Sequence, residues 1–445
     1  MQRDADNVRH GRAGAWLNHW EPEDDTYWES KGKSIAWNAL AITTANLMMA
    51  FAVWFVVSAI VVKLNKIGFG FSTTQLFWLA AMPGLAGGTL RILHTFLIPV
   101  FGTRKVVSIS TAALLIPLIG WNFAVQNSGT PYWLFLVLAF AAGLGGGNFS
   151  SFMPSTSLFF PKRLQGTALG LQAGIGNFGV SLVQFLTPWV IGFAILGSTQ
   201  TTDTGKEMWL QNAVLIWIPF VAFFAIVAWL RLKSIPVQAN IRQQGDIFRD
   251  KHTWLMTSLY VMTFGSFAGF STTFPLMIKD LYGGFEKAPD PLSYAFLGPL
   301  VGSGARVIAG PLADRFGGGR LTQLSGIGLV GSAISVAFFV QPSSTAEFKW
   351  FVLTMLAVFF FAGIGNASTF KQIPMIFQPR QAGGVIGWTA AMAAYGPFIF
   401  AVLIAAVIDW TGSPMPFFVG AAVFYAANVG INWWYYLRPG AERPC

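Results

Sequence analysis

Twelve apolar runs constrain this chain more than any other feature. They fall at approximately 37–62, 75–100, 104–125, 132–160, 164–196, 209–233, 252–280, 291–314, 319–340, 348–378, 383–409 and 414–438. A helix needs about 20 apolar residues to cross the hydrocarbon core of a bilayer. Only 10% of the 445 residues are charged, whereas soluble domains carry roughly 25%. The sequence therefore predicts an all-α membrane protein of twelve transmembrane helices.

The longest segment between runs, 234–251, divides them six and six. We therefore expect five parts. These are a cytoplasmic tail (1–36), a first six-helix half (37–233), a cytoplasmic linker (234–251), a second half (252–438) and a short tail (439–445). The first 36 residues are polar, which argues against a cleavable signal peptide. The single cysteine, Cys445, excludes a disulfide framework and any cysteine-based metal site.

The distribution of Lys and Arg predicts the orientation. With the amino terminus inside, 19 of the 28 cations fall in cytoplasmic segments and six in external loops. Positive charge gathers on cytoplasmic loops of membrane proteins. We therefore expect a multi-pass protein of the cytoplasmic membrane with both termini in the cytoplasm. The same rule accounts for the net charge of +10, so this charge need not indicate binding to nucleic acid.

Glycine-rich stretches recur in the two halves. Residues 143–179 read GLGGGNFSSFMPSTSLFFPKRLQGTALGLQAGIGNFG, and 362–387 read AGIGNASTFKQIPMIFQPRQAGGVIG. The glycines of interest are Gly143, Gly145, Gly146, Gly174 and Gly176, with Gly363 and Gly365 in the second stretch. Small residues at such spacing let helices approach closely or let a ligand touch backbone. Internal repeats are typical of transporters, whose substrate site lies near the midplane between the halves.

Three cations, Arg91, Arg306 and Lys371, lie inside the runs, whereas the carboxylates lie at run ends, in loops or in the tail. Arg91 and Arg306 are each eight residues from the cytoplasmic end of their run, hence about 12 Å deep. A charge at that depth normally faces a partner or a water-filled cavity. Three cations without a protein anion indicate an anionic substrate, unless the arginines cap backbone carbonyls instead.

The two arginines also correspond between halves. An offset of 215 residues places Arg91 on Arg306 and Phe101-Gly102 on Phe316-Gly317. We expect one guanidinium from each half on opposite sides of a central site.

These stretches resemble the nitrate/nitrite porter family of the major facilitator superfamily. Residues 143–179 resemble its first nitrate signature and 363–377 its second. The segment GPLADRFGGGR (310–320) resembles the superfamily's gating motif, with Asp314 and Arg315 in the gating positions, and FGTRK (101–105) is a degraded copy.

The resemblance implies roles for particular residues. Arg91 and Arg306 would hold the anion, Asn177 would complete the polar shell, and three aromatic residues, Phe149, Tyr260 and Phe264, would enclose it. Nitrate is planar and delocalised, which suits a guanidinium fork and aromatic faces. For Phe149 and Phe264 ordinary packing is the alternative, because buried Phe is common.

Lys371 departs from part of the family and leaves the coupling mode open. As a third cation in the cavity it would deepen the anion trap and could carry a proton. His94, one turn after Arg91, could also titrate, or could simply be packed. Proton-coupled uptake and nitrate–nitrite exchange both remain open, since exchange needs no protonatable carboxylate.

The leading hypothesis is a secondary transporter of nitrate and nitrite, with protons as a further partner, working by rocking of the two halves. The same fold carrying an organophosphate or small carboxylate is the alternative, and a transporter-like sensor is a third. We expect no enzyme activity, no cofactor and no metal. We further expect a monomer in the lipid bilayer.

Overall fold

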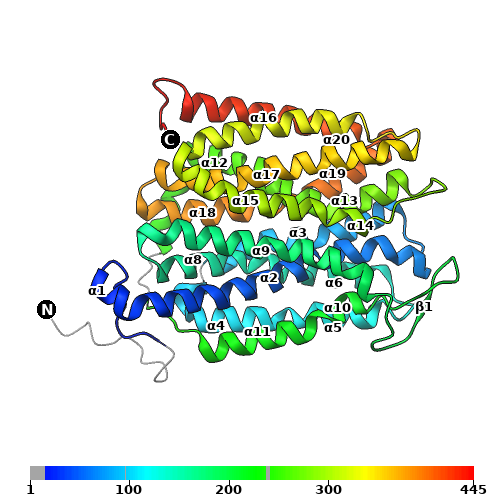
Figure 1. The fold of residues 1–445 in the computed structure, drawn as a ribbon, viewed down its shortest axis with the longest axis horizontal. Helices are drawn as coiled ribbons and strands as arrows, with labels where there is room; N and C mark the ends of the chain where they lie inside the picture. Colours follow the sequence, from blue (N-terminus) through cyan, green and yellow to red (C-terminus); the bar gives the residue numbers. More distant parts are fainter. Residues whose placement is uncertain (1–15, 96, 237–240) are drawn as a thin grey trace.

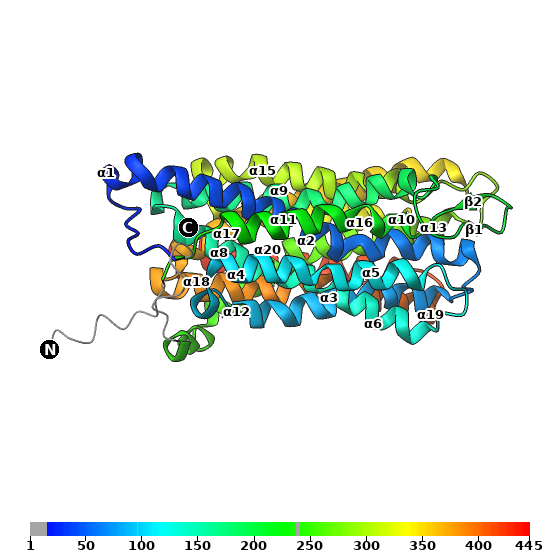
Figure 2. The same cartoon turned by 90° about the horizontal axis from the view of Figure 1, so that it is seen from below.

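The computed structural model describes residues 16–95, 97–236 and 241–445. Helices run roughly parallel to one another and form an elongated bundle (Figure 1). The first described residues and the C-terminus lie at one end, here named the terminal end. The opposite, distal end carries a small hairpin of strands β1 and β2 (Figure 2).

The first half comprises these helices and strands: α1 Asp25–Tyr27, α2 Lys33–Leu64, α3 Thr73–His94, α4 Leu97–Ala113, α5 Leu115–Ala124, α6 Tyr132–Ala142, α7 Leu144–Gly147, α8 Phe149–Phe159, α9 Lys162–Val190, β1 Gln200–Thr201, β2 Glu207–Met208, α10 Asn212–Leu215 and α11 Trp217–Arg231. Two short turns complete it: the π-helical turn Trp28–Gly32 and the 3-10 turn Asn65–Ile67.

The second half follows the 3-10 turn Ile241–Arg249 and comprises α12 Lys251–Tyr260, α13 Ser266–Tyr282, α14 Leu292–Ala295, α15 Leu297–Phe316, α16 Gly318–Ala337, α17 Phe348–Ile376, α18 Pro379–Ala393, α19 Gly396–Thr411 and α20 Met415–Asn432. Its other short turns are Val261–Gly265, Thr345–Glu347 and Trp433–Leu437. In the described chain, eleven helical stretches are long and apolar enough to cross a membrane. Helix α16, with 20 residues, occupies the position of the ninth predicted span.

The two halves lie side by side, the second half (yellow-green to red) above the first (blue to green) in Figure 1. They meet where α9 packs along α15, α3 along α19 and α2 against α13. Helices α2 and α13 are buried along most of their length. The outer helices instead expose large apolar side chains such as Phe223, Ile327 and Val423. This distribution is the one expected for a bundle whose outer surface faces lipid.

Glycines reverse the chain at two positions that correspond between the halves. Gly102, with φ 75°, breaks α4 soon after its start, and Gly317, with φ 92°, separates α15 from α16. Both values lie in the left-handed region that glycine adopts at little cost. Gly102 and Gly317, which the sequence alignment paired, therefore adopt the same left-handed backbone conformation.

Residues 25–36 differ from the predicted polar tail, because they extend the first span as a continuous helix. The Asp24 side chain accepts a hydrogen bond from the Tyr27 backbone N–H at 2.9 Å and caps the start. Nearby, the Trp20 indole donates to the Leu158 carbonyl at 2.9 Å, and Asp25 pairs with Arg163. This segment therefore packs on the turn that joins α8 to α9.

The C-terminal segment, predicted as a short tail, also packs against the bundle. Arg443 pairs with Asp250 at 2.8 Å and Glu442 with Lys251 at 2.6 Å. His252 also contacts the Glu442 carboxylate, and these hydrogen bonds lower the pKa of that carboxyl. These ion pairs fasten the C-terminal segment to the junction between the linker and α12.

Candidate functional site

Arg91, on α3 of the first half, is fully buried near the centre of the bundle. Its Nε donates to the Gly146 carbonyl at 2.9 Å, and its Nη1 donates to the Ala390 carbonyl at 2.7 Å. Its Nη2 is buried and has no hydrogen-bond partner among the described residues. A buried charged donor without a partner is costly, so this atom is a candidate for contact with an anionic ligand.

Arg306, on α15 of the second half, is 5% exposed. When the Asn177 amide oxygen is turned toward it, that oxygen accepts a hydrogen bond from Arg306 Nη1 at 3.1 Å. In the same orientation the Asn177 amide nitrogen donates to the Ala173 carbonyl at 3.2 Å. Asn177 lies on α9, so one guanidinium of the second half is bound by an amide of the first.

One aromatic ring joins the two arginines. The Phe264 ring centre is 5.1 Å from Arg91 Cζ and 6.0 Å from Arg306 Cζ. Tyr260 stacks on Phe264 with ring centres 5.4 Å apart and 6° between planes. The Phe149 ring, from α8, lies 4.6 Å from Arg91 Cζ. The six residues that the resemblance implied, two cations, an amide and three aromatics, therefore form one buried cluster between the halves.

Two further aromatic residues in this cluster were missed from the sequence. The Phe370 ring lies 5.7 Å from Arg306 Cζ and the Trp54 ring 5.2 Å from Arg91 Cζ. The recurrence of Asn148–Phe152 (NFSSF) as Asn366–Phe370 (NASTF) sets Phe370 on Phe152 and not on Phe149, so it signals an aromatic residue in this stretch but not its contact with Arg306. Trp54 carried no comparable signal, since its place depends on how closely α2 approaches α3 and α7.

The contacts of Lys371 differ from those predicted. It was predicted to be a third cation without a protein anion, but its ammonium pairs with the Asp314 carboxylate. Asp314 lies at the terminal end of α15, and the two side chains are 56% and 40% exposed for Asp314 and Lys371. The neighbouring Arg315 lies over the Phe316 ring, at 5.4 Å. The lysine is therefore neutralised within its own half.

The signature glycines lie where helices approach each other closely. A Cβ on Gly146 would come within 2.6 Å of the Trp54 ring, and Gly143 and Gly145 abut backbone of α3 and α2. Gly363 faces α15, and Gly365 faces Thr263 and Ser325. These contacts show close helix packing at all five positions.

Two glycines on α9 face opposite ways. A Cβ on Gly174 would lie 2.5 Å from Val307 Cγ2 in the second half. A Cβ on Gly176 would lie 2.8 Å from Leu47 Cδ2 in the first half. Gly174 therefore lies at the contact between halves, and Gly176 within one half.

His94 is buried one turn from Arg91, and its Nδ1 shares a hydrogen bond with the Ser151 hydroxyl at 2.9 Å. This contact joins α3 to α8. The position of His94 is therefore that of a packed histidine.

Comparisons with known proteins give the family. The Major Facilitator Superfamily profile matches residues 42–370. The chain is 62% identical to "Probable nitrate/nitrite antiporter NarK2" of Thermus thermophilus, over 97% of this chain and 99% of that protein. It is 37% identical to "Nitrate/nitrite transporter NarU" of Escherichia coli strain K12, over 95% and 96% of the two chains.

Solved structures agree on the fold. The inward open xylose transporter XylE from E. coli superposes with a TM-score of 0.66 at 14% identity, over 89% of this chain and 95% of that one. A bacterial homologue of the lysosomal transporter Spinster superposes with a TM-score of 0.63. With the profile match over most of its length and relatives above 30% identity over nearly all of it, the chain belongs to the Major Facilitator Superfamily and, within it, to the nitrate/nitrite porter family.

Proposed function

We propose that this protein carries nitrate and nitrite across the cytoplasmic membrane by alternating access, and that Arg91 and Arg306 bind the anion. The observation that carries the proposal is the Arg91 Nη2 donor, buried without a hydrogen-bond partner in the described chain, beside a guanidinium from the other half. The names of the relatives support the substrate class.

The chemistry of the cluster favours a small flat monoanion. Guanidinium groups present paired donors in one plane, which match the oxygens of nitrate. Phe149, Tyr260 and Phe264 supply faces against which a planar, weakly hydrated anion can lie. An organophosphate or carboxylate, the alternative cargo, would need more volume and stronger desolvation than these closely packed rings favour.

The orientation is part of the same proposal. The excess of Lys and Arg on segments at the terminal end supports a cytoplasmic location for that end. Substrate would then reach the arginines from the cytoplasm through the terminal end and from outside through the distal end. We further propose a monomer, because each half supplies one arginine and the site needs no second copy.

Exchange of nitrate for nitrite fits the structure better than coupling to a proton through Lys371. A bound anion neutralises the arginine pair during the rocking step, whereas an empty cavity with buried cations resists closure. The Lys371–Asp314 pair removes the free lysine on which the proton-coupled alternative depended.

The test is uptake of labelled nitrate into proteoliposomes, with and without internal nitrite and with and without a proton gradient. Exchange predicts strong stimulation by internal nitrite and little by the gradient alone. Uptake driven by the gradient without internal anion would instead favour symport. Absence of nitrate uptake under all four conditions, with sugar phosphate or carboxylate uptake present, would assign the alternative cargo.

A further inference from the structure

A polar face of α9 leads from the arginine cluster toward the distal end. Asn177, Ser181 and Gln184 are spaced by four and three residues, so they lie on one side of the helix. All three side chains hydrogen-bond to residues of the second half. Gln184 is two turns from Asn177, about 10.5 Å along the helix. This face therefore forms a line of polar groups between the binding cluster and the distal end.

Gln184 joins three central helices. Its Nε2 donates to the Ser271 carbonyl of α13 at 2.7 Å and to the Ser58 hydroxyl of α2 at 3.0 Å. The orientation of the amide is fixed, because a carbonyl only accepts hydrogen bonds. Its Oε1 is buried and has no hydrogen-bond partner among the described residues. A buried amide with one unpaired atom is costly, and it gains when water or a ligand reaches it.

A proline explains why the Ser271 carbonyl accepts from another helix. In α13 this carbonyl would normally accept from the N–H four residues later, but that residue is Pro275, which has none. Gln184 supplies the missing donor from the other half. When the halves separate at the distal end, the carbonyl and the amide both lose this bond, and each then needs water or a ligand.

A second unpaired polar group lies between Gln184 and Arg306. The Ser303 hydroxyl of α15 is fully buried and has no hydrogen-bond partner in the described part of the chain. It is three residues from Arg306 toward the distal end, about 4.5 Å along the helix. Val307, one turn later on the same face, packs against Gly174 of α9. Ser303 therefore faces the same contact between α9 and α15.

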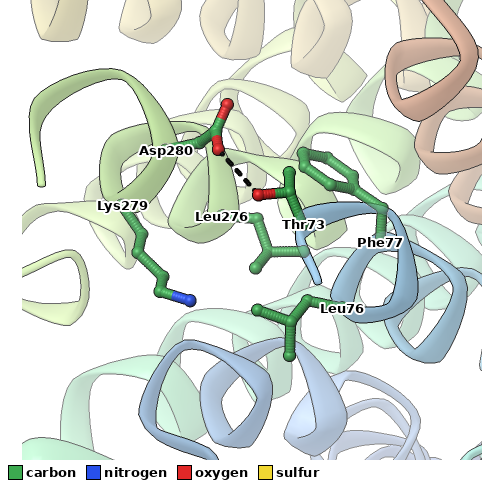
Figure 3. A pocket seen from close by; sticks show the side chains of 6 residues that line it. All are labelled: Thr73, Leu76, Phe77, Leu276, Lys279 and Asp280. Carbon is green, nitrogen blue, oxygen red and sulfur yellow. Dashed lines mark hydrogen bonds between the residues drawn. The ribbon is translucent and has the colours of Figure 1, made fainter. Parts of the chain in front are cut away.

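The cavity at the distal end is balanced in charge. It has a volume of about 130 Å³ and lies between α3 and α13. Figure 3 shows its one carboxylate, Asp280, bonded to Thr73, and its one lysine, Lys279, beside it on the same helix. Leu276, also in the lining, is five residues from Ser271, about 7.5 Å along α13. Selection of an anion from this side therefore depends on hydrogen-bond donors deeper in the bundle.

We propose that Gln184 binds the anion on its way between the distal end and the arginines, and that Ser303 is the next group on this route. While the distal end is closed, the Gln184 donors bind Ser271 and Ser58. When α9 and α13 separate, the same donors bind the anion. A neutral donor suits this task, because a group on a route must bind its ion weakly enough to release it. The inference rests on the proposed anion transport but concerns residues outside the arginine cluster.

Two variants separate the contact with the anion from the contact with Ser271. Gln184→Met keeps the length of the side chain and removes its donors. Pro275→Ala gives the Ser271 carbonyl a backbone N–H from its own helix, which weakens the bond between the halves and leaves the Gln184 amide intact. Exchange is measured in proteoliposomes with labelled nitrate saturating on both faces, and the dissociation constant for nitrate is measured in detergent.

Gln184→Met should lower the exchange rate about tenfold, the effect of losing one hydrogen bond to a charged ligand. Pro275→Ala should leave the rate close to that of the wild type. The dissociation constant should stay close to the wild-type value in both, because the arginine cluster is unchanged. Equal changes of rate in the two variants would show that Gln184 only fastens the halves, and a wild-type rate in Gln184→Met would also overturn the proposal.

A labelling measurement tests the same position without transport. Gln184→Cys, in a Cys445→Ser background, should react with a charged methanethiosulfonate added at the distal face. Leu182→Cys is the matched control and should not react, because it shares the side of α9 that carries the exposed rings of Phe185 and Trp189. Absence of reaction in Gln184→Cys would overturn the route. If the wild type did not exchange nitrate, the proposed function would be rejected, while this labelling would still decide whether position 184 lines a route from the distal end.

Discussion

The guanidinium of Arg91 has two separate tasks. Nε and Nη1 donate to the Gly146 and Ala390 carbonyls, so the group is held rigidly, while Nη2 has no hydrogen-bond partner in the described part of the chain and can bind a ligand. Ala390 belongs to α18 in the second half, so Arg91 itself bridges the halves. A movement of one half against the other must therefore lengthen or exchange this bond, which links substrate binding to the rocking step.

We expect Arg91→Lys and Arg306→Lys each to lower nitrate kcat/KM by about 10- to 100-fold, because lysine keeps the charge but loses hydrogen bonds worth ~1.5–3 kcal/mol each. The amount of protein inserted should stay close to that of the wild type. Uptake in proteoliposomes measures the effect. Arg438→Lys, half-buried at the terminal end over the Trp434 ring, is the matched control. Wild-type affinity in either central variant would exclude that arginine from the binding site.

At the scale of single residues, the sequence could predict polar side chains that lie deep within apolar runs. Arg91, Arg306 and Asn177 were found as polar groups in apolar runs, and they meet in the structure. The partner of Lys371 could not be found in that way, because the pair depends on the register between α15 and α17. Asp314 lies at the end of its helix, and only the packing of those helices brings Lys371 within reach.

Helix α9 has one face toward each half, and its glycines separate the two kinds of contact. Gly174→Ala places a methyl group against Val307 across the halves, whereas Gly176→Ala places one against Leu47 within the first half. We expect Gly174→Ala to lower the transport rate several-fold with little change in binding, and Gly176→Ala to lower thermal stability, since overpacking costs about 1–3 kcal/mol. Rates in proteoliposomes and melting temperatures in detergent separate the two. Equal effects of both variants on both measurements would contradict this division.

The ion pair between α15 and α17 leads to a separate expectation. Both side chains of the Lys371–Asp314 pair are more than a third exposed, so the pair contributes about 0–1 kcal/mol. We expect Lys371→Gln to retain nitrate–nitrite counterflow at close to the wild-type rate. Counterflow and gradient-driven uptake are assayed separately. Loss of gradient-driven uptake alone, with counterflow intact, would make Lys371 a coupling residue and would reverse the preference for exchange.

Among the elements, the apolar runs were predicted well, because each is long enough to cross the membrane. The glycine reversals at 102 and 317 were not predicted, although the correspondence between the halves had paired the two positions. The helical start at Asp25 was missed, because residues 25–36 are polar and their order depends on contacts with the turn after α8. A polar segment of this kind has no hydrophobic periodicity from which a helix can be inferred.

At the scale of the whole molecule, polar contacts fasten the two halves at the distal end. Lys63 pairs with Asp290, Thr73 bonds Asp280 at 3.2 Å and Thr74 bonds Asp409 at 2.8 Å. In each contact the donor belongs to the first half and the carboxylate to the second. These groups therefore have to separate together whenever the distal end opens, and their strength contributes to the balance between the two orientations of the transporter.

The Lys63–Asp290 pair is the most enclosed of these contacts, with side chains 7% and 34% exposed. Exposed ion pairs are worth about 0–1 kcal/mol, and removing one partner of a fully buried pair costs ~3–5 kcal/mol. We expect an intermediate ~1–2 kcal/mol for Lys63→Gln or Asp290→Asn, which shifts the population toward the distal-open state by about 5- to 30-fold. Lys349→Gln, exposed at the same end and absent from the charges that act on Lys63, is the matched control.

Spin labels at Glu207→Cys and Glu286→Cys, one in each half, can follow this shift through the distance between them. The background is Cys445→Ser, because Cys445 is the only native cysteine. Each single variant should increase the fraction of long distances, and the charge exchange Lys63→Asp with Asp290→Lys should restore the wild-type distribution. Because the pair lies outside the arginine cluster, nitrate should still drive the labelled protein between the same two states. An unchanged distance distribution in both single variants would show that the pair does not hold the distal end closed.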